Sequence, residues 1–391
     1  MTTTDKSTPN LKDIVFQFPL IIYYRSEPRR AKGFVDVMVT NLEQKSAFQS
    51  IMEKMLIPCR EMIADVQALL NTQSLMRASS TNNTYYSNYH PTEEVYAYLD
   101  SLAAEFPAEA SVFTLGKTYG GKDIRVIHLS TDKNAGKKTL WFDGGIHARE
   151  WIAVPTVMYI ADTLLHKYAA KDPVVMELLN NFDIMVCPII NVDGYDYTWA
   201  KDGDRMWRKT RSANSRNSCP GTDPNRNWDF HWGEAGANTV ACSESYQGSK
   251  AASEIEIQTV QNFLCQKNIN FVGYINFHSY SQTWMSNWGY TDDLPADFSD
   301  QNALSAAAVA AIKSVHGKVY EYGTISRTLY PASGSSADYT YGVCGIKYSY
   351  GVELRDTGEY GFLLPATEIV PTAEEIYEAI LAMASYIQDH P

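Results

Sequence analysis

The pattern of apolar and polar positions predicts a large α/β domain from about residue 85 onward. Short apolar runs, typical of buried strands, alternate with longer segments whose apolar residues recur at helical spacing. The predicted strands are residues 111–118, 124–130, 140–143, 182–190, 271–277 and 346–354, and the predicted helices are residues 91–105, 150–166, 253–266, 303–316 and 372–388. Such alternation is typical of a sheet with helices packed against it.

A smaller α/β pattern precedes this domain. Its predicted strands are residues 14–24, 33–40 and 58–64, and its predicted helices are residues 46–56 and 65–76. The pattern ends in a polar segment, residues 76–83, where Arg77 is followed by Ser, Thr and Asn residues. Exposed polar segments of this kind are preferred sites of proteolysis.

Composition limits the classes of partner. With 391 residues and 45% hydrophobic residues, the chain is long enough for one large core and a smaller unit. The formal net charge of −12 argues against nucleic acid or an anionic membrane as a partner. We find no apolar run approaching the roughly 18–20 residues that a membrane-spanning helix needs.

The chain has six cysteines and no Cys-x-x-Cys pair, so a structural zinc site is not expected. Cys219 and Cys242 both lie in a loop region rich in Gly, Ser and Asn. A disulfide there would stabilise the fold by about 3.5 kcal/mol in the chain-entropy model. Cys187 lies in an apolar strand pattern and is expected to be a buried thiol. The states of the other cysteines stay open.

A split metal site is the most informative chemical pattern. His147 and Glu150 lie three residues apart, where a predicted strand passes into a helix, and His278 follows another buried run. In α/β sheets, ligands bind near the carboxyl ends of strands, so these two strand ends could converge. Two His and one carboxylate form a ligand set of catalytic zinc, which keeps one position open. The His-x-x-Glu pair alone is a weak signal, since most such pairs lie on solvated helix faces.

Because Glu150 is needed as a ligand, a catalytic base has to come from elsewhere. Glu353 ends a mostly apolar predicted strand, and burial raises the pKa of a carboxyl group, which suits a proton shuttle. The structural alternative is a buried ion pair between Glu353 and Arg355.

Seven segments together resemble the metallocarboxypeptidases of the pancreatic carboxypeptidase A/B type, in the family's order and over about residues 85–391. They are His147-Ala-Arg-Glu150, Asn191-Val-Asp-Gly-Tyr195, Arg205-Met-Trp-Arg-Lys209, Asn225-Arg-Asn-Trp228, Phe277-His-Ser-Tyr280, Leu329-Tyr-Pro-Ala-Ser-Gly334 and Glu353-Leu-Arg-Asp-Thr-Gly358. The resemblance implies an α/β fold, a mixed eight-stranded sheet between helices, preceded by a small α+β prodomain.

Carried over by motif, the resemblance implies that His147, Glu150 and His278 bind one Zn²⁺ per chain. Glu353 would be the general base that activates the attacking water and then protonates the leaving amine. Arg208, together with the zinc, would stabilise the tetrahedral oxyanion. Removing one such oxyanion donor typically costs about 3–4 kcal/mol of transition-state stabilisation.

The same resemblance implies an exopeptidase. Asn225, Arg226 and Tyr330 would hold the C-terminal carboxylate of a peptide or protein, and Arg149 and Tyr280 would line the outer subsites. A bidentate Arg recognises a carboxylate better than Lys. The structural alternatives are a salt bridge for Arg149 and simple packing for Tyr280.

The expected preference is of the A type, for aromatic or aliphatic C-terminal residues. Relatives that prefer Lys or Arg place an acid at the base of the side-chain pocket, and the aligned residue here is Ala337. The other aligned pocket positions are apolar or small: Met285, Gly289, Ile325, Leu329, Ala332 and Gly351. A shifted loop would instead bring the adjacent Asp338 to the pocket. A one-residue insertion near Gly342 to Gly345 carries Cys344.

Residues 20–77 resemble the family's inhibitory prodomain, which implies a zymogen activated near Arg77 by a trypsin-like protease. Residues 78–391 would then be the catalytic domain, and residues 1–19 stay unassigned. The strand and helix that usually open the prodomain have no counterpart, so the prodomain is expected to be incomplete.

We expect a secreted monomer, although no clear signal peptide is present; the Asn82-Asn83-Thr84 glycosylation sequon is weak support for secretion. Two alternatives to an active carboxypeptidase are a non-catalytic peptide-binding member of the fold and a zinc deacylase on a related fold.

Overall fold

The computed structural model describes residues 21–24, 35–39, 41–79, 84–132, 135–214 and 218–390. The chain divides into two compact units, residues 1–66 and residues 67–391. In the first unit, strands β1 (Ile21–Tyr24) and β2 (Val35–Met38) pair antiparallel. Helix α2 (Leu42–Lys54) follows, and the Asn41 side chain caps it by accepting a hydrogen bond of 2.8 Å from the backbone N–H of Gln44.

The first two predicted strands of this unit agree with the structure where it is described, and the predicted helix 46–56 corresponds to α2, which begins at Leu42. Residues 1–20, which include part of the predicted strand 14–24, lie outside the described residues. The prediction of a strand at 58–64 is wrong: the segment is irregular. Pro58 has no N–H to donate to a sheet, and the next residues, Cys59 to Glu61, are exposed rather than half-buried.

Helix α3 (Val66–Ser79) is longer than predicted and includes Arg77. It therefore begins at the last residue of the first unit and continues in the second. Within the second unit, the Gln73 side chain donates a hydrogen bond of 2.8 Å to the carbonyl oxygen of Leu363. The sequon at Asn82 lies outside the described residues.

In the described part of the second unit, one mixed eight-stranded sheet has the order β3-β4-β6-β5-β7-β10-β8-β9. The strands are β3 (Ala110–Lys117), β4 (Asp123–Leu129), β5 (Lys138–Asp143), β6 (Phe182–Cys187), β7 (Asn270–Ser279), β8 (Thr283–Ser286), β9 (Glu321–Thr324) and β10 (Tyr348–Leu354). The central strands β6, β5, β7 and β10 run parallel, and β4 and β8 flank them antiparallel. The predicted fold class is confirmed.

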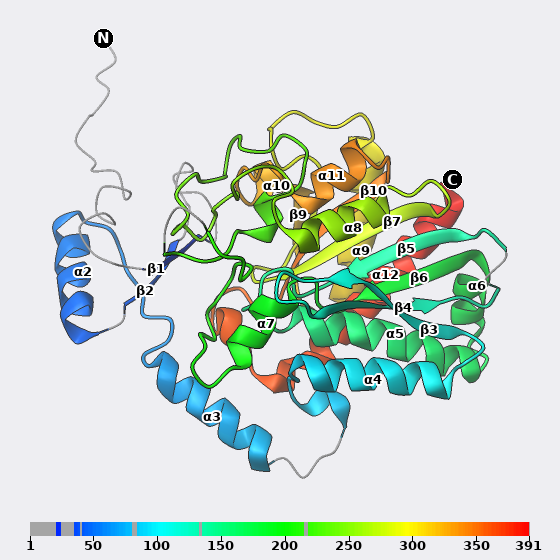
Figure 1. The fold of residues 1–391 in the computed structure, drawn as a ribbon, viewed down its shortest axis with the longest axis horizontal. Helices are drawn as coiled ribbons and strands as arrows, with labels where there is room; N and C mark the ends of the chain where they lie inside the picture. Colours follow the sequence, from blue (N-terminus) through cyan, green and yellow to red (C-terminus); the bar gives the residue numbers. More distant parts are fainter. Residues whose placement is uncertain are drawn as a thin grey trace. The chain divides into compact units, whose positions relative to one another are not determined.

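Helices cover both faces of this sheet (Figure 1). They are α4 (Thr92–Glu105), α5 (Ala153–Ala169), α6 (Pro173–Asn181), α7 (Val192–Trp199), α8 (Ile255–Leu264), α9 (Phe298–His316), α10 (Ile325–Thr328), α11 (Ser336–Gly342) and α12 (Ile369–Asp389), with short 3₁₀ turns at Tyr85–Ser87, Pro224–Arg226, Gly361–Leu363 and Ala366–Glu368. Helix α12 packs against α5 and α9, whereas α11 packs against α8, β7 and β10. Coverage on both faces explains why the central strands are continuous apolar runs.

The alternation of side chains along β7 decides which residues reach the site. A Cβ on Gly273 would lie 2.7 Å from Cε of Met383 on α12, so this position faces the α12 layer. Successive strand residues point to opposite faces. Asn276 and His278 therefore face the α11 layer, on the opposite side of the sheet.

Two predicted helix starts differ from the structure. The helix predicted at 253–266 begins at Ile255, and its cap residue, Glu254, makes no side-chain cap bond. The Glu254 carboxylate instead accepts hydrogen bonds from Thr210 and Ser212. The helix predicted at 91–105 begins at Thr92, whose hydroxyl donates to Asp196, and Pro91 is the cap residue.

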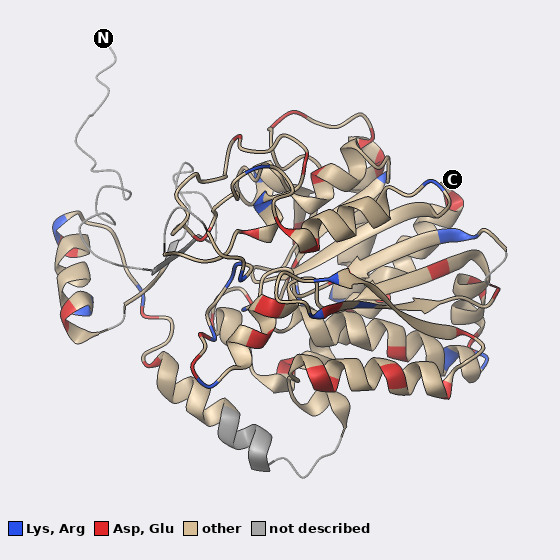
Figure 2. Ribbon diagram, in the orientation of Figure 1, with Lys and Arg blue, Asp and Glu red and all other residues tan. Residues whose placement is uncertain are grey.

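The surface agrees with the acidic composition. Figure 2 shows acidic residues along helix α4, with basic residues scattered over other elements. Among the described residues, we find no helix with the length and apolar character needed to cross a lipid bilayer.

The predicted disulfide between Cys219 and Cys242 is confirmed, and Cys187 is a buried free thiol. A second disulfide joins Cys265, at the end of α8, to Cys344, in the loop that follows α11. Cys344 therefore ties this loop to α8.

We expect the second disulfide to stabilise the fold at least as much as the first, because its cysteines are 79 residues apart rather than 23. Replacing both Cys265 and Cys344 by Ser should lower the free energy of unfolding by about 3–5 kcal/mol. Denaturant unfolding measures this, with the exposed Cys59→Ser as the control that leaves stability unchanged. A loss below that of the Cys219/Cys242 double variant would contradict this expectation.

Candidate active site

Two glycines allow the end of β5 to turn tightly into the site. Gly145 has a left-handed backbone with φ +58°. A Cβ on Gly144 would lie 3.0 Å from the carbonyl oxygen of Ala153, so the backbone has no room for a side chain there. The chain then passes through Ile146 to His147.

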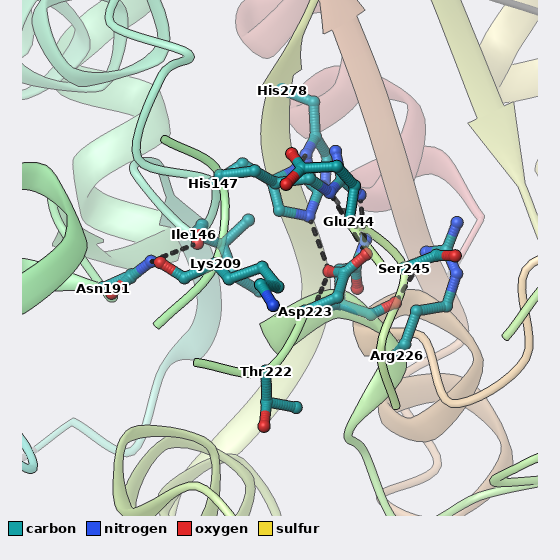
Figure 3. A network of polar contacts seen from close by, with 12 residues as sticks. Ile146, His147, Asn191, Lys209, Thr222, Asp223, Arg226, Glu244, Ser245 and His278 are labelled. Carbon is teal, nitrogen blue, oxygen red and sulfur yellow. Dashed lines mark hydrogen bonds and ion pairs between the residues drawn. The ribbon is translucent and has the colours of Figure 1, made fainter. Parts of the chain in front are cut away.

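Asn191 fixes this turn to a second loop. Its side-chain amide donates to the carbonyl oxygens of Ile146 and Lys209, at 3.2 and 2.9 Å (Figure 3). The backbone N–H of Ala148 donates to the carbonyl oxygen of Arg208 at 3.1 Å. The segments that carry His147 and Arg208 are therefore held side by side.

Three buried side chains meet at this point. Nδ1 of His147 lies 2.8 Å from Oε1 of Glu150 and 3.0 Å from Nδ1 of His278. Nδ1 of His278 lies 3.0 Å from Oε2 of Glu150. These groups form a cluster that could hold a metal ion, each offering one ligand atom.

Asp223 orients this cluster, and the sequence reasoning missed it. One carboxylate oxygen lies 3.0 Å from Nε2 of His147, and the other accepts hydrogen bonds of 3.1 and 2.9 Å from Arg208 (Figure 3 draws the His147 contact). Burial alone would raise the pKa of Asp223, but the charge of Arg208 and the interactions with His147 and Arg226 together outweigh it and hold the pKa well below its usual range. The one available signal was the Asp-Pro turn directly before Asn225.

The donor set fits zinc. A carboxylate accepts, so His147 donates its Nε2–H to Asp223 and keeps the lone pair on Nδ1 for a metal. A His whose second nitrogen is held by a carboxylate is a common arrangement around zinc. Two imidazoles and one carboxylate, all buried, are the ligands of an open catalytic zinc site.

Glu353 lies beside the cluster, on β10. It stands in register with His278 on the neighbouring parallel strand β7. Its Oε2 is buried and has no hydrogen-bond partner among the described residues. Burial first, and then the Glu150 carboxylate, raise the pKa of Glu353 to about 8. A metal cation at the cluster would act in the opposite direction.

The structural alternative for Glu353 is wrong. Arg355 pairs instead with Glu375, through Nε at 3.0 Å and through Nη2, and with Glu368 at 2.6 Å. The carboxylates that pair with Arg355 are therefore those of Glu375 and Glu368, not that of Glu353. The Glu353 carboxyl group is therefore left for the site.

The cluster opens into a pocket, and polar groups suited to binding an anion line this pocket. Arg208, Asn225, Arg226 and Tyr330 line it together with His147, His278 and Glu353. Arg226 is held by donating to the carbonyl oxygens of Gly236 and Asn225, at 2.9 and 2.8 Å. Its guanidinium lies 5.7 Å from the centre of the Tyr330 ring.

The other end of the pocket is mostly apolar. Met285, Ile325, Leu329, Ala332, Ala337 and Gly351 line it. Gly289 does not line it. Asp338 is turned away, since its carboxylate accepts hydrogen bonds from the backbone N–H groups of Gly289 and Tyr290. Burial raises the pKa of Asp338 to about 6.

Arg149 and Tyr280 lie outside this pocket, and both contact Phe362. Arg149 is buried, forms a 2.7 Å ion pair with Glu244 and stacks on the Phe362 ring at 4.3 Å. The Tyr280 ring meets the Phe362 ring edge-on at 4.9 Å. The contacts of these residues are therefore those of the structural alternatives: Arg149 forms a salt bridge and Tyr280 packs against an aromatic ring. Sequence reasoning gave no signal for Phe362.

Arg205 holds the backbone of Arg149 and Phe362 through hydrogen bonds. It lies half-buried over the Trp151 ring at 3.7 Å and donates to the carbonyl oxygens of Arg149 and Phe362, at 2.8 and 2.6 Å. Burial lowers the pKa of Arg205 to about 9. It is a structural cation rather than a solvated one.

Comparisons with known proteins agree with this geometry. A carboxypeptidase B of Astacus astacus is 45% identical over 305 residues, which cover 78% of this chain and 98% of that protein. A carboxypeptidase A1 of Sus scrofa is 41% identical, over 84% of this chain and 79% of that protein.

Solved structures give the same result. The crystal structure of thrombin activatable fibrinolysis inhibitor has a TM-score of 0.88 and 33% identity, covering 97% of this chain and 95% of that one. A carboxypeptidase A from Helicoverpa armigera has a TM-score of 0.83 and 26% identity, covering 96% and 93%. Residues 95–379 match the sequence profile of the zinc carboxypeptidases. The chain therefore belongs to the zinc carboxypeptidase family, and it is a metallocarboxypeptidase that uses Zn²⁺.

Proposed function

We propose that this chain is an exopeptidase that removes single C-terminal residues, with an A-type preference for aromatic and aliphatic side chains. One observation carries the proposal. A single pocket combines the proposed zinc ligands His147 and His278, the unpartnered carboxyl oxygen of Glu353, and the cations Arg208 and Arg226.

The cations and amides of the pocket would select a free C-terminus. Arg226 keeps donors beyond the two that it spends on Gly236 and Asn225, since a guanidinium carries five N–H groups. A peptide carboxylate can accept two of them in parallel. Asn225 and Tyr330 would add neutral donors beside it. An internal peptide bond presents no such charge at this position.

The remaining groups would carry out the hydrolysis. When bound, zinc would supply Lewis-acid chemistry, drawing electron density from an oxygen and making water more acidic near neutral pH. The Glu353 carboxylate would take a proton from the attacking water and pass it to the leaving amine. Arg208, held in place by Asp223, would donate hydrogen bonds to the oxygen that becomes negative.

The side-chain preference follows from the lining of the pocket. The names of the relatives include both A and B carboxypeptidases, so they do not choose between the types. Ala337 is buried where an acid would be needed to pair with a buried Lys or Arg. Both oxygens of the adjacent Asp338 already accept hydrogen bonds, Oδ1 from Asn287 and Gly289 and Oδ2 from Gly289 and Tyr290.

We further propose that the chain is made as a zymogen, with residues 20–77 as its prodomain and a trypsin-like protease cutting near Arg77. Arg77 lies two residues before the end of helix α3, where helices fray. We propose secretion, which agrees with two disulfides among the described residues. A monomer suffices, since all the proposed site residues come from one chain.

The direct test is release of C-terminal Phe, Leu, Lys or Glu from matched peptides, before and after limited trypsin treatment. We expect release of Phe and Leu to appear on cleavage near Arg77 and to stop with a zinc chelator. The same peptide with a C-terminal amide should react about 10- to 100-fold more slowly. The amide has no charged carboxylate to accept hydrogen bonds from the pocket.

Other outcomes would overturn parts of this proposal. Equal release before and after cleavage would contradict the zymogen. Equal hydrolysis of the amide would contradict the exopeptidase. A folded, zinc-loaded, cleaved chain that binds these peptides without hydrolysing them would be a non-catalytic peptide-binding protein.

Replacing Ala337 by Asp should convert the preference. A buried acid would pair with a C-terminal Lys, so the ratio of kcat/KM for Lys over Phe should rise at least about 30-fold. Ala337→Asn is the matched control, since it has nearly the same shape and no charge. If the wild type already releases Lys faster than Phe, the A-type assignment is wrong.

A further inference from the structure

Three polar side chains that line the pocket have no role in the proposed function: Asn276, Ser335 and Ser336. Asn276, on β7, lines this pocket and is completely buried. Burying an amide is costly unless it is hydrogen-bonded, and an amide inside an otherwise apolar pocket can impose specificity. Asn276 therefore needs its own explanation.

The strand register places Asn276 in one row across the sheet, here called the floor row. Asp143 on β5, Asn276 on β7, Gly351 on β10 and Met285 on β8 stand in register on neighbouring strands. Residues in register point to the same face of a sheet. Gly351 has no side chain, and a Cβ there would meet only Cδ1 of Ile325, at 3.9 Å, so this position leaves room in the row between Asn276 and Met285.

Hydrogen bonds fix which end of the amide is available. The Trp141 indole, which can only donate, gives its N–H to Oδ2 of Asp143 at 2.7 Å. Nδ2 of Asn276 donates to Oδ1 of the same carboxylate. The amide nitrogen of Asn276 therefore points toward Asp143, and the amide oxygen, Oδ1, points away from Asp143.

The amide oxygen faces helix α11, which packs over the pocket end of β7. It accepts one hydrogen bond of 3.2 Å, from the hydroxyl of Ser336 at the start of that helix. An amide oxygen can accept two hydrogen bonds. A second donor can therefore be accommodated at Oδ1, and a bound side chain in the pocket can supply it.

Resting on the proposed function, we infer that Asn276 is a specificity-determining residue of the side-chain pocket. Its Oδ1 accepts a hydrogen bond from the tip of the bound C-terminal side chain. Apolar walls with one acceptor at the floor row favour a large apolar side chain that ends in a hydroxyl. The chemical class selected is a phenol, so a C-terminal Tyr is preferred over Phe.

A basic side chain fits this arrangement less well. A buried ammonium needs a charged partner, and the acceptor offered by Asn276 is neutral. Asp143 does not line the pocket, and both of its oxygens already accept hydrogen bonds. The floor row therefore offers a single neutral acceptor to the substrate.

The test compares three peptides that differ only in the C-terminal residue: Tyr, 4-fluorophenylalanine and Phe. The fluorine has nearly the size of the hydroxyl but cannot donate a hydrogen bond. With the full, zinc-loaded, trypsin-treated chain, kcat/KM for Tyr should exceed that for 4-fluorophenylalanine about three- to tenfold. The difference should lie in KM, since the contact is made equally before and during reaction.

Variants assign the effect to Asn276. Asn276→Leu keeps the shape but has no acceptor, so the ratio for Tyr over 4-fluorophenylalanine should fall to one or below. Asn276→Ser, a smaller change that leaves room for water beside Asp143, should reduce the ratio if the Leu variant does not fold. Met285→Leu, an apolar change in the same floor row, is the matched control and should alter all three peptides in parallel.

Failure of this inference can be told from failure of the proposed function. Equal rates for Tyr and 4-fluorophenylalanine in the wild type, with Phe still released, would overturn the role of Asn276 alone. A Tyr preference that persists in both Asn276 variants would do the same. If a folded, zinc-loaded chain released none of the three residues, both proposals would be overturned.

Discussion

The convergence of His147, Glu150 and His278 is the constraint on which the rest of the site depends. Their ligand atoms lie 2.8 to 3.0 Å apart in a buried position, where uncompensated polar groups are costly. A cation at their centre removes that cost. Parallel strands β5 and β7 bring two carboxyl ends to the same edge of the sheet, and this is what delivers the ligands from distant parts of the chain.

Four cations around the site divide into two groups by whether they line the pocket. Arg355 pairs with Glu375 and Glu368, and Arg205 donates to two backbone carbonyl oxygens, so both act as supports outside the pocket lining. Arg208 and Arg226 line the pocket; Asp223 holds the first and two carbonyl oxygens hold the second, and each guanidinium keeps further N–H groups. Of these four cations, only the second group can meet a substrate anion in the pocket, and this distinction needs the folded structure rather than the position of each Arg in the sequence.

The sequence predicted the parts of the fold that depend on long, uniform patterns. The central strands are continuous apolar runs, so they were predictable, and the proposed ligands occur in motifs, so their convergence in one cluster could be expected. Strands β8 and β9 and helices α10 and α11 are only four to seven residues long, and tertiary packing rather than local propensity determines them. Asp223 and the Cys265–Cys344 bridge depend on contacts between distant segments, which a single sequence does not reveal.

The central claim is that this cluster holds one zinc ion and that Glu353 is a base rather than a ligand. A competition titration with a fluorescent zinc chelator, on the wild type, His278→Ala and Glu353→Gln, tests it most directly. We expect one zinc per wild-type chain, nearly equal affinity for Glu353→Gln, and affinity about 100-fold weaker for His278→Ala. Unchanged affinity in His278→Ala, or the loss of zinc in Glu353→Gln, would contradict it.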